Sequence, residues 1–193
     1  MSREHDLRII KTQNAIKTSL MNLIEVKSFR EITINDIAEG AIINRSTFYL
    51  HYTDKYDLLD NLVNEGISEV IGTISLKTHI RDGKLDYNLF SIDLSNSLKV
   101  ISRQAQLYRF ILNDSESLGL RQKTEKALGD CLSRGFPAET MIARDLLIEI
   151  ISSIYVSVIG WWLNNDMKYS AAFMAEELVK FFELGSKSLL PNN

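Results

Sequence analysis

Apolar residues recur along the first part of the chain at spacings of three and four, the pattern of amphipathic helices. This pattern predicts a first helix over residues 6–26, and a short helix that begins at Thr33 follows it. A turn over 41–43 then leads to a second short helix over 44–51, and a longer stripe predicts a fourth helix from residue 54 to about residue 76. The apolar positions are Ile9, Ile16, Leu20, Leu23, Ile24, Ile34, Ile37, Ala38, Ala41, Phe48, Leu59, Leu62, Val63, Val70, Ile71 and Ile74.

The remainder of the chain has the same helical character. Helices are predicted over residues 87–102, 104–113, 116–133, 138–164 and 169–190, and residues 79–86 form the clearest loop. With only 2 Pro and 9 Gly, the chain favours long helices over a sheet. The pattern therefore predicts an all-α protein of about nine helices, with a small head over 1–55 and a larger body over 56–193.

One predicted helix is apolar on nearly every face. Residues 146–163 contain a single charge, Glu149, and their length is the lower limit for a membrane span. A helix that is apolar all round is equally expected in a protein core or an interface. Serines within the segment and the polar run after it favour a buried helix, so we expect no membrane association.

Composition and charge narrow the class of protein. Hydrophobic residues make up 45% of the 193 positions, which indicates a globular chain with a real core. The net charge of -3 is not that of a generic nucleic-acid coat protein. Residues 1–55, however, hold eight Lys and Arg against seven Asp and Glu, a net charge of +1. A protein that reads one short site needs a few well-placed cations rather than a basic chain.

Two features indicate a reducing, cytoplasmic location. The single cysteine, Cys131, excludes an internal disulfide and a cysteine metal cluster, and we expect it to be buried. The N-terminal residues MSREHDLRII are charged and contain no apolar signal core. No cofactor is expected.

Residues 33–52 have the organisation of a helix-turn-helix. The Thr33 and Asp36 pair at the start is similar to a capping box. The second helix would enter the major groove of DNA, while the helix before it crosses the backbone. This second helix carries polar side chains suited to DNA: Asn44, Arg45, Ser46, Thr47, Tyr49 and His51.

The same segment resembles the tetracycline-repressor (TetR/AcrR) family of transcriptional regulators. The matching positions are Ile37-Ala38, Thr47-Phe48-Tyr49, His51-Tyr52, Asp54-Lys55 and Leu58-Leu59, and the match covers roughly residues 9–70. The resemblance implies a three-helix DNA-binding head joined by a fourth helix to a ligand-binding and dimerisation body. The body resembles the family in length and helical character, and Trp161 to Asp166 is faintly similar to a subgroup of dihydroxyacetone-kinase operon regulators.

Each polar position in the head has an expected role. Arg45 is the best candidate for reading a base, since its guanidinium can pair with guanine O6 and N7. Asn35 matches a family position that often reaches a base, and Ser46 suits a base or a phosphate. The phosphate contacts are expected from Thr33, Thr47, Tyr49, His51 and Lys55. His51 also fits a packing role, Lys55 also fits a solvated surface position, and Tyr52 fits packing better than contact.

The turn departs from the family pattern at Ile42, where glycine is usual. A β-branched residue disfavours the left-handed backbone that glycine tolerates. Either the turn stays in the right-handed region, or Gly40 absorbs the bend.

The two last predicted helices suit a homodimer, because together they present more apolar surface than one small body covers. The expected interface residues are Ser157, Gly160, Met174, Leu178, Phe181, Phe182, Gly185 and Leu189. A purely intramolecular core is the alternative.

The resemblance also implies an effector pocket in the body, whose occupation would tilt the fourth helix and release DNA. The candidate lining residues are Tyr108, Arg109, Phe110, Glu149, Ser153, Tyr155, Trp161 and Trp162. Each of them also fits ordinary core or surface placement.

The function predicted is a transcriptional regulator, most simply a repressor, that binds a double-stranded palindromic operator and is released by a small molecule. A regulator without an inducer, or one that acts through a protein partner, is an alternative. A helical enzyme finds no support: the sequence has no Ser/His/Asp arrangement, phosphate loop or metal spacing, and only three histidines, His5, His51 and His79. A helical scaffold would not need the polar set around Arg45.

Overall fold

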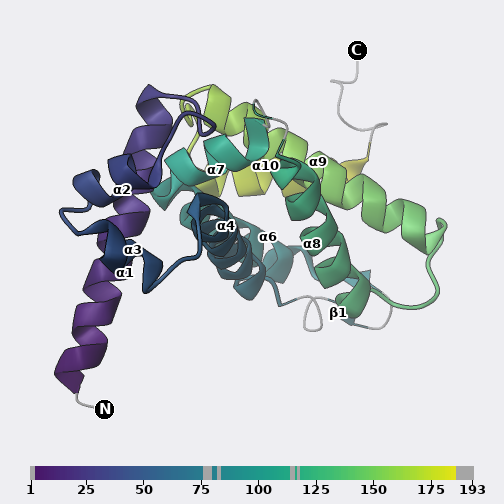
Figure 1. The fold of residues 1–193 in the computed structure, drawn as a ribbon. Helices are drawn as coiled ribbons and strands as arrows, with labels where there is room; N and C mark the ends of the chain where they lie inside the picture. The colour runs from purple at the N-terminus through teal and green to yellow at the C-terminus, as the bar shows by residue number, and fades with distance from the viewer. Residues whose placement is uncertain (1–2, 76–79, 82–83, 114–115, 117, 186–193) are drawn as a thin grey trace. The chain divides into compact units, whose positions relative to one another are not determined.

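The computed structural model describes residues 3–75, 80–81, 84–113, 116 and 118–185. In this part of the chain nine helices account for almost all regular structure, which confirms the predicted all-α fold (Figure 1). Their bounds are α1 Arg3–Val26, α2 Ile34–Gly40, α3 Arg45–Tyr49, α4 Lys55–Gly72, α6 Tyr87–Arg103, α7 Ala105–Asn113, α8 Leu120–Gly135, α9 Arg144–Asn164 and α10 Ala171–Leu184.

A short ribbon replaces part of the predicted loop at 79–86. β1 (Ile80–Arg81) and β2 (Lys84–Leu85) pair in antiparallel fashion, with Ile80 opposite Leu85. Two residues per strand are too few to change the class of the fold.

The chain divides into two compact units, and α4 begins in one and ends in the other. The first unit, called the head below, comprises Met1–Glu65 with Ser115–Leu118; the second, the body, comprises Gly66–Asp114 with Gly119–Asn193. The sequence-based boundary at residue 55 coincides with the start of α4.

The head has a small core made from all of its helices. Ile16 and Leu20 of α1, Ile37 of α2 and Phe48 of α3 are fully buried, as is Leu58 at the start of α4. The first turn of α4 is capped by Asp54, whose carboxylate accepts the backbone N–H groups of Tyr56 and Asp57. The buried side chains of this core, Phe48 among them, fix α3 against the rest of the head.

In the body, α6 packs against α10, and α9 packs against both α7 and α8. Trp162 of α9 is almost fully buried, and its indole N–H donates to the carbonyl of Tyr169 at 2.8 Å. Cys131 is buried as expected, and burial raises the pKa of its thiol. By length and composition α9 could cross a membrane, but this is weak support, since core helices pass the same test.

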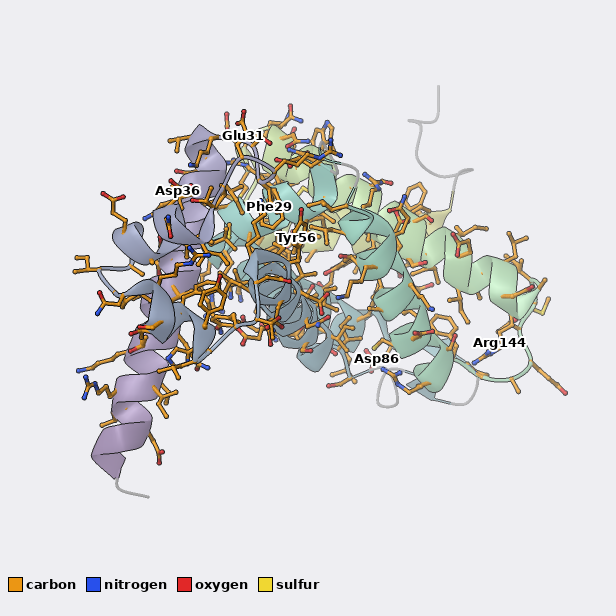
Figure 2. All side chains as sticks on the ribbon, viewed as in Figure 1. Phe29, Glu31, Asp36, Tyr56, Asp86 and Arg144 are labelled. Atoms are coloured by element: carbon orange, nitrogen blue, oxygen red, sulfur yellow. The ribbon has the colours of Figure 1, made fainter. Side chains whose placement is uncertain are left out.

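The last-but-one helix begins six residues later than predicted, at Arg144 instead of residue 138. The cause is the Arg144 side chain, which turns back to the end of α8 and donates to the carbonyls of Ser133, Phe136 and Pro137 (Figure 2). Of these, the Ser133 carbonyl lies in the last turn of α8, where carbonyls lack intrahelical partners, and a basic side chain at a helix C-terminus satisfies such a group.

Candidate nucleic-acid interface

The start of α2 is held by a complete capping box. The Thr33 hydroxyl accepts the backbone N–H of Asp36 at 3.2 Å, and the Asp36 carboxylate accepts the backbone N–H of Thr33 at 2.7 Å. Lys27 also donates to this carboxylate, at 2.7 Å. Both bonds favour the ionised form, so the pKa of Asp36 falls from 3.8 to about 2, with the Lys27 bond the largest cause. The predicted cap is confirmed.

The lowered pKa of Asp36 predicts a pH-dependent contribution to the stability of the head. A carboxyl group whose pKa is lower in the folded state stabilises the protein above its unfolded pKa and loses this effect as the pH falls through its folded pKa. Asp36→Asn should therefore lower the melting temperature at pH 7, and the difference from wild type should shrink between about pH 4 and pH 2. Thermal unfolding of both proteins across this range measures it, and a constant difference would contradict the assignment.

The turn between α2 and α3 takes neither of the two forms considered from the sequence. Ile42 itself adopts a left-handed backbone, with φ at 56°. Its N–H donates to the carbonyl of Glu39, and the N–H of Ile43 donates to the carbonyl of Ala38, both at 3.0 Å. These two bonds are those of a Schellman motif, which ends a helix with one left-handed residue. Gly40 lies inside α2, where a Cβ atom would come within 2.4 Å of the Ser19 hydroxyl oxygen, so it serves close packing.

The strained turn predicts a stabilising substitution. The left-handed region costs a residue with a Cβ atom roughly 1–2 kcal/mol, and the Ile42 side chain is 92% exposed, so its removal loses little packing. Ile42→Gly should raise the free energy of unfolding by about 0.5–1 kcal/mol, after the added chain entropy of glycine is subtracted. Urea unfolding measures this, with Ile42→Ala as the control that keeps a Cβ atom and should gain less. A less stable glycine variant would show that the turn is not strained.

Helix α3 presents its polar residues to solvent, as a reading helix requires. Asn44, Arg45 and Ser46 are exposed at its N-terminal end, and the Asn44 side chain makes no capping hydrogen bond. The Arg45 guanidinium donates to the Tyr49 hydroxyl at 3.1 Å and lies 5.5 Å from the centre of its ring. Tyr49 therefore holds the charged group of Arg45 at the surface of the helix.

The other predicted contact residues differ in how far they reach solvent. Asn35 and Thr33 are exposed near the start of α2, and Thr47 and His51 are half-buried. Tyr52 is buried, as expected for a packing residue, and burial raises its pKa to about 12. The DNA contacts of these residues remain predictions, since no nucleic acid is present.

The structure gives Lys55 a role that the sequence did not suggest. Its ammonium group donates to the carbonyls of Phe29, Arg30 and Ile32 at 2.9, 2.9 and 2.8 Å. It also lies 5.0 Å from the ring centre of Phe29 and 5.4 Å from that of Tyr56, which contact each other edge to face (Figure 2). An ammonium has three donors, and all three are used here. This geometry favours a structural role for Lys55, holding the loop between α1 and α2, over the predicted phosphate contact.

The same loop is held at its N–H groups by a residue far away in the sequence. The Glu116 carboxylate accepts the backbone N–H of Phe29 at 2.5 Å and that of Arg30 at 3.2 Å. Sequence reasoning missed this residue, because nothing local marks an acid 87 positions from its partner.

Comparison with known proteins agrees with the geometry of the head. Residues 18–62 match the family described as bacterial regulatory proteins, tetR family, and residues 94–184 match a transcriptional regulator C-terminal region of the same group. The chain belongs to the TetR family. It is therefore a DNA-binding transcriptional regulator and not an enzyme.

Part of this TetR-family chain is similar in sequence to a named regulator. The uncharacterised HTH-type transcriptional regulator YxbF of Bacillus subtilis is 29% identical over 75 residues, or 38% of this chain. The match spans only 20% of the length of YxbF.

Solved structures share the fold of the whole chain. A putative TetR-family regulator from Syntrophomonas wolfei is 19% identical, with a TM-score of 0.73 and coverage of 94% of this chain and 98% of that one. The dihydroxyacetone kinase operon activator DhaS has a TM-score of 0.64 at 15% identity, covering 91% and 96%. The regulator FadR from Bacillus subtilis, solved in complex with stearoyl-CoA, has a TM-score of 0.64 at 18% identity, covering 89% and 96%.

Two apolar cavities lie among the described residues of the body of this TetR-family chain, and most of the predicted pocket residues lie elsewhere. Tyr155 borders both cavities and Tyr108 borders the second. The Arg109 side chain instead donates to the carbonyl of Leu163 and pairs with Asp166, and Trp162 belongs to the core. The others, which line neither cavity, are Phe110, Glu149, Ser153 and Trp161. The cavities are lined mainly by ordinary aliphatic residues, which no local pattern distinguishes from core.

The predicted interface residues also separate into two groups. Gly160 and Met174 are buried within the body, and Leu178 and Phe182 line the first cavity, so we reassign these four to the interior. Ser157, Phe181 and Gly185 are exposed. Leu189 lies outside the described residues.

Proposed function

We propose that this TetR-family chain is a cytoplasmic repressor that binds a palindromic operator as a homodimer and is released by a small molecule. Base recognition is supported mainly by the exposed N-terminal end of α3. There the Arg45 guanidinium donates a hydrogen bond to the Tyr49 hydroxyl, beside exposed Asn44 and Ser46. An arginine at this place can pair with a guanine in the major groove.

The proposal is tested by selecting binding sites from a random duplex library at moderate salt. A two-fold palindrome among the selected sequences is expected, because two copies of α3 would read two equal half-sites about one helical turn apart. No enrichment, with the protein folded and dimeric, would contradict operator binding.

Homodimer formation is supported by apolar side chains left exposed on the last two helices. On α9, Leu146, Ile150 and Trp161 follow a helical spacing, and all are exposed. On α10, Phe173 and Phe181 are 42% and 41% exposed. Several exposed apolar side chains on the same two helices favour an interaction site there. The faces are accessible in the single chain, in contrast to the buried Met174 and Gly160.

Phe181→Glu should convert the dimer to a monomer, because it places a charge in the proposed apolar interface. Sedimentation velocity measures the change. Ile92→Glu is the matched control, since Ile92 is an exposed apolar residue of α6, outside the two helices concerned. If the Phe181→Glu variant kept the sedimentation coefficient of wild type, Phe181 would not lie in the dimer interface.

Release by an effector is supported by the continuity of α4. Its first part belongs to the head, and its last part supplies Ile67, Val70 and Ile71 to the wall of the second cavity. A ligand that binds better to a form with a displaced α4 would lower the affinity for DNA by the ratio of its two affinities. The FadR structure, solved in complex with stearoyl-CoA, supports a ligand with a long acyl chain for this architecture.

A further inference from the structure

Helix α3 is oriented in the head by two aromatic residues that lie one turn apart. Phe48 is fully buried and Tyr52 is nearly so, and the centres of their rings are 5.8 Å apart. The N–H of Tyr52 donates to the carbonyl of Phe48 at 3.0 Å, so the helical turn continues past Tyr49, the last residue of α3. Phe48 and Tyr52 therefore define the side of this helix that faces the core.

The opposite side of the same turns bears Ser46 and Leu50. Residues two positions apart on an α-helix point in directions about 200° apart, and residues four apart share a face. Ser46 and Leu50 are each two positions from Phe48, and both are exposed. Leu50 is 81% exposed, so an aliphatic side chain lies on the outward side of the reading helix.

The outward side chains form one polar row and one mixed row. Arg45 and Tyr49, four positions apart and joined by a hydrogen bond of 3.1 Å, form the polar row. Ser46 and Leu50 form the row beside it. A leucine side chain has no charge and no hydrogen-bonding group, so it is not suited to a phosphate or to the polar edge of a base. The apolar group that base edges present in the major groove is the C5-methyl of thymine.

We propose that Leu50 is a specificity-determining residue that packs against the methyl group of a thymine in each half-site of the operator. This inference rests on the proposed function, because it requires α3 to enter the major groove. Leu50 lies about 7.5 Å further along the helix axis than Arg45, so the two side chains read different base pairs of one half-site. Arg45 selects a guanine by hydrogen bonds, and Leu50 selects a thymine by burying its methyl group. A cytosine at that place has no methyl group and leaves the leucine without an apolar contact.

The experiment removes the methyl groups one at a time from the selected operator. Each thymine of one half-site is replaced in turn by uracil, which lacks only the 5-methyl group and keeps the same base pairing. Fluorescence anisotropy with the full-length protein measures the affinity. At one thymine the replacement should weaken wild-type binding about three- to fivefold, the effect of losing one buried methyl group.

Leu50→Ala should weaken binding to the thymine operator by a similar or larger factor and should not distinguish thymine from uracil at that position. Because Leu50 is exposed, this variant should keep the melting temperature of wild type. Val26→Ala is the matched control, since Val26 is an aliphatic residue at the end of α1 and is 78% exposed. It should keep the wild-type response to uracil.

The proposal is overturned if the wild type is indifferent to uracil at every position, or if the selected half-site contains no thymine. It is also overturned if Leu50→Ala responds to uracil as the wild type does; equal weakening on every sequence would then place Leu50 against the sugar backbone. In these cases a selected palindrome still supports operator reading by α3, and only the thymine contact fails. If no operator is selected at all, the proposed function fails, and the thymine contact fails with it.

Discussion

Replacing Lys55 by methionine should lower the free energy of unfolding of the head by about 2–3 kcal/mol, because a charge-assisted hydrogen-bond network is lost. Methionine keeps most of the apolar stem but removes the three donors that hold the carbonyls of Phe29, Arg30 and Ile32. Two of these bonds are partly buried, so water replaces the lost donors only in part. The contacts of the ammonium with the rings of Phe29 and Tyr56 are lost as well.

Urea unfolding measures the stability, and the salt dependence of operator binding separates the two roles of Lys55. A structural lysine predicts lower stability with a salt slope close to that of wild type. A phosphate contact predicts unchanged stability with a slope reduced by about one unit. Lys11→Met, at an exposed position of α1, is the control and should change stability little. Wild-type stability together with a reduced salt slope of operator binding would show that Lys55 contacts a DNA phosphate instead.

Replacing Arg45 by alanine should weaken operator binding by about 1–3 kcal/mol and relax the preference at one base pair of each half-site. Arg45 is exposed, so its loss should leave the fold intact. Fluorescence anisotropy with the selected operator and with single base-pair variants measures both effects. If the affinity fell equally on every sequence, Arg45 would contact phosphate instead of a base.

Tyr49→Phe is the matched test of how Arg45 is held. It removes the hydroxyl that accepts from the guanidinium at 3.1 Å but keeps the ring beneath the charge. A smaller loss than that of Arg45→Ala is expected, and the loss should disappear in the Arg45→Ala background, because coupled residues are not additive.

The parts of the structure that follow local rules could be predicted from the sequence. The capping box at Thr33, the buried Phe48 and the helical class of the fold depend on residues close together in the chain, and all three are confirmed. The start of α9 at Arg144 was missed, because the Arg144 side chain bonds the Ser133 carbonyl in the last turn of α8 and two carbonyls that follow that helix.

Roles set by contacts between distant segments could not be predicted. Lys55 follows the family pattern, yet its partners lie 23 to 26 positions away and occupy every donor. The left-handed conformation of Ile42 is neither of the two forms expected from the sequence, because a β-branched residue disfavours it, and the Schellman hydrogen bonds hold it there. The lining of the cavities was missed because aliphatic residues give the same pattern whether they fill a core or border a space.

The central claim is that two copies of α3 read the two halves of one operator. The most direct measurement combines sedimentation of the complex with the selected palindrome and a comparison of affinities after one half-site is scrambled. Two chains per duplex, together with a large loss of affinity on scrambling either half, are predicted. One chain per duplex with an affinity that does not depend on the second half would contradict the claim.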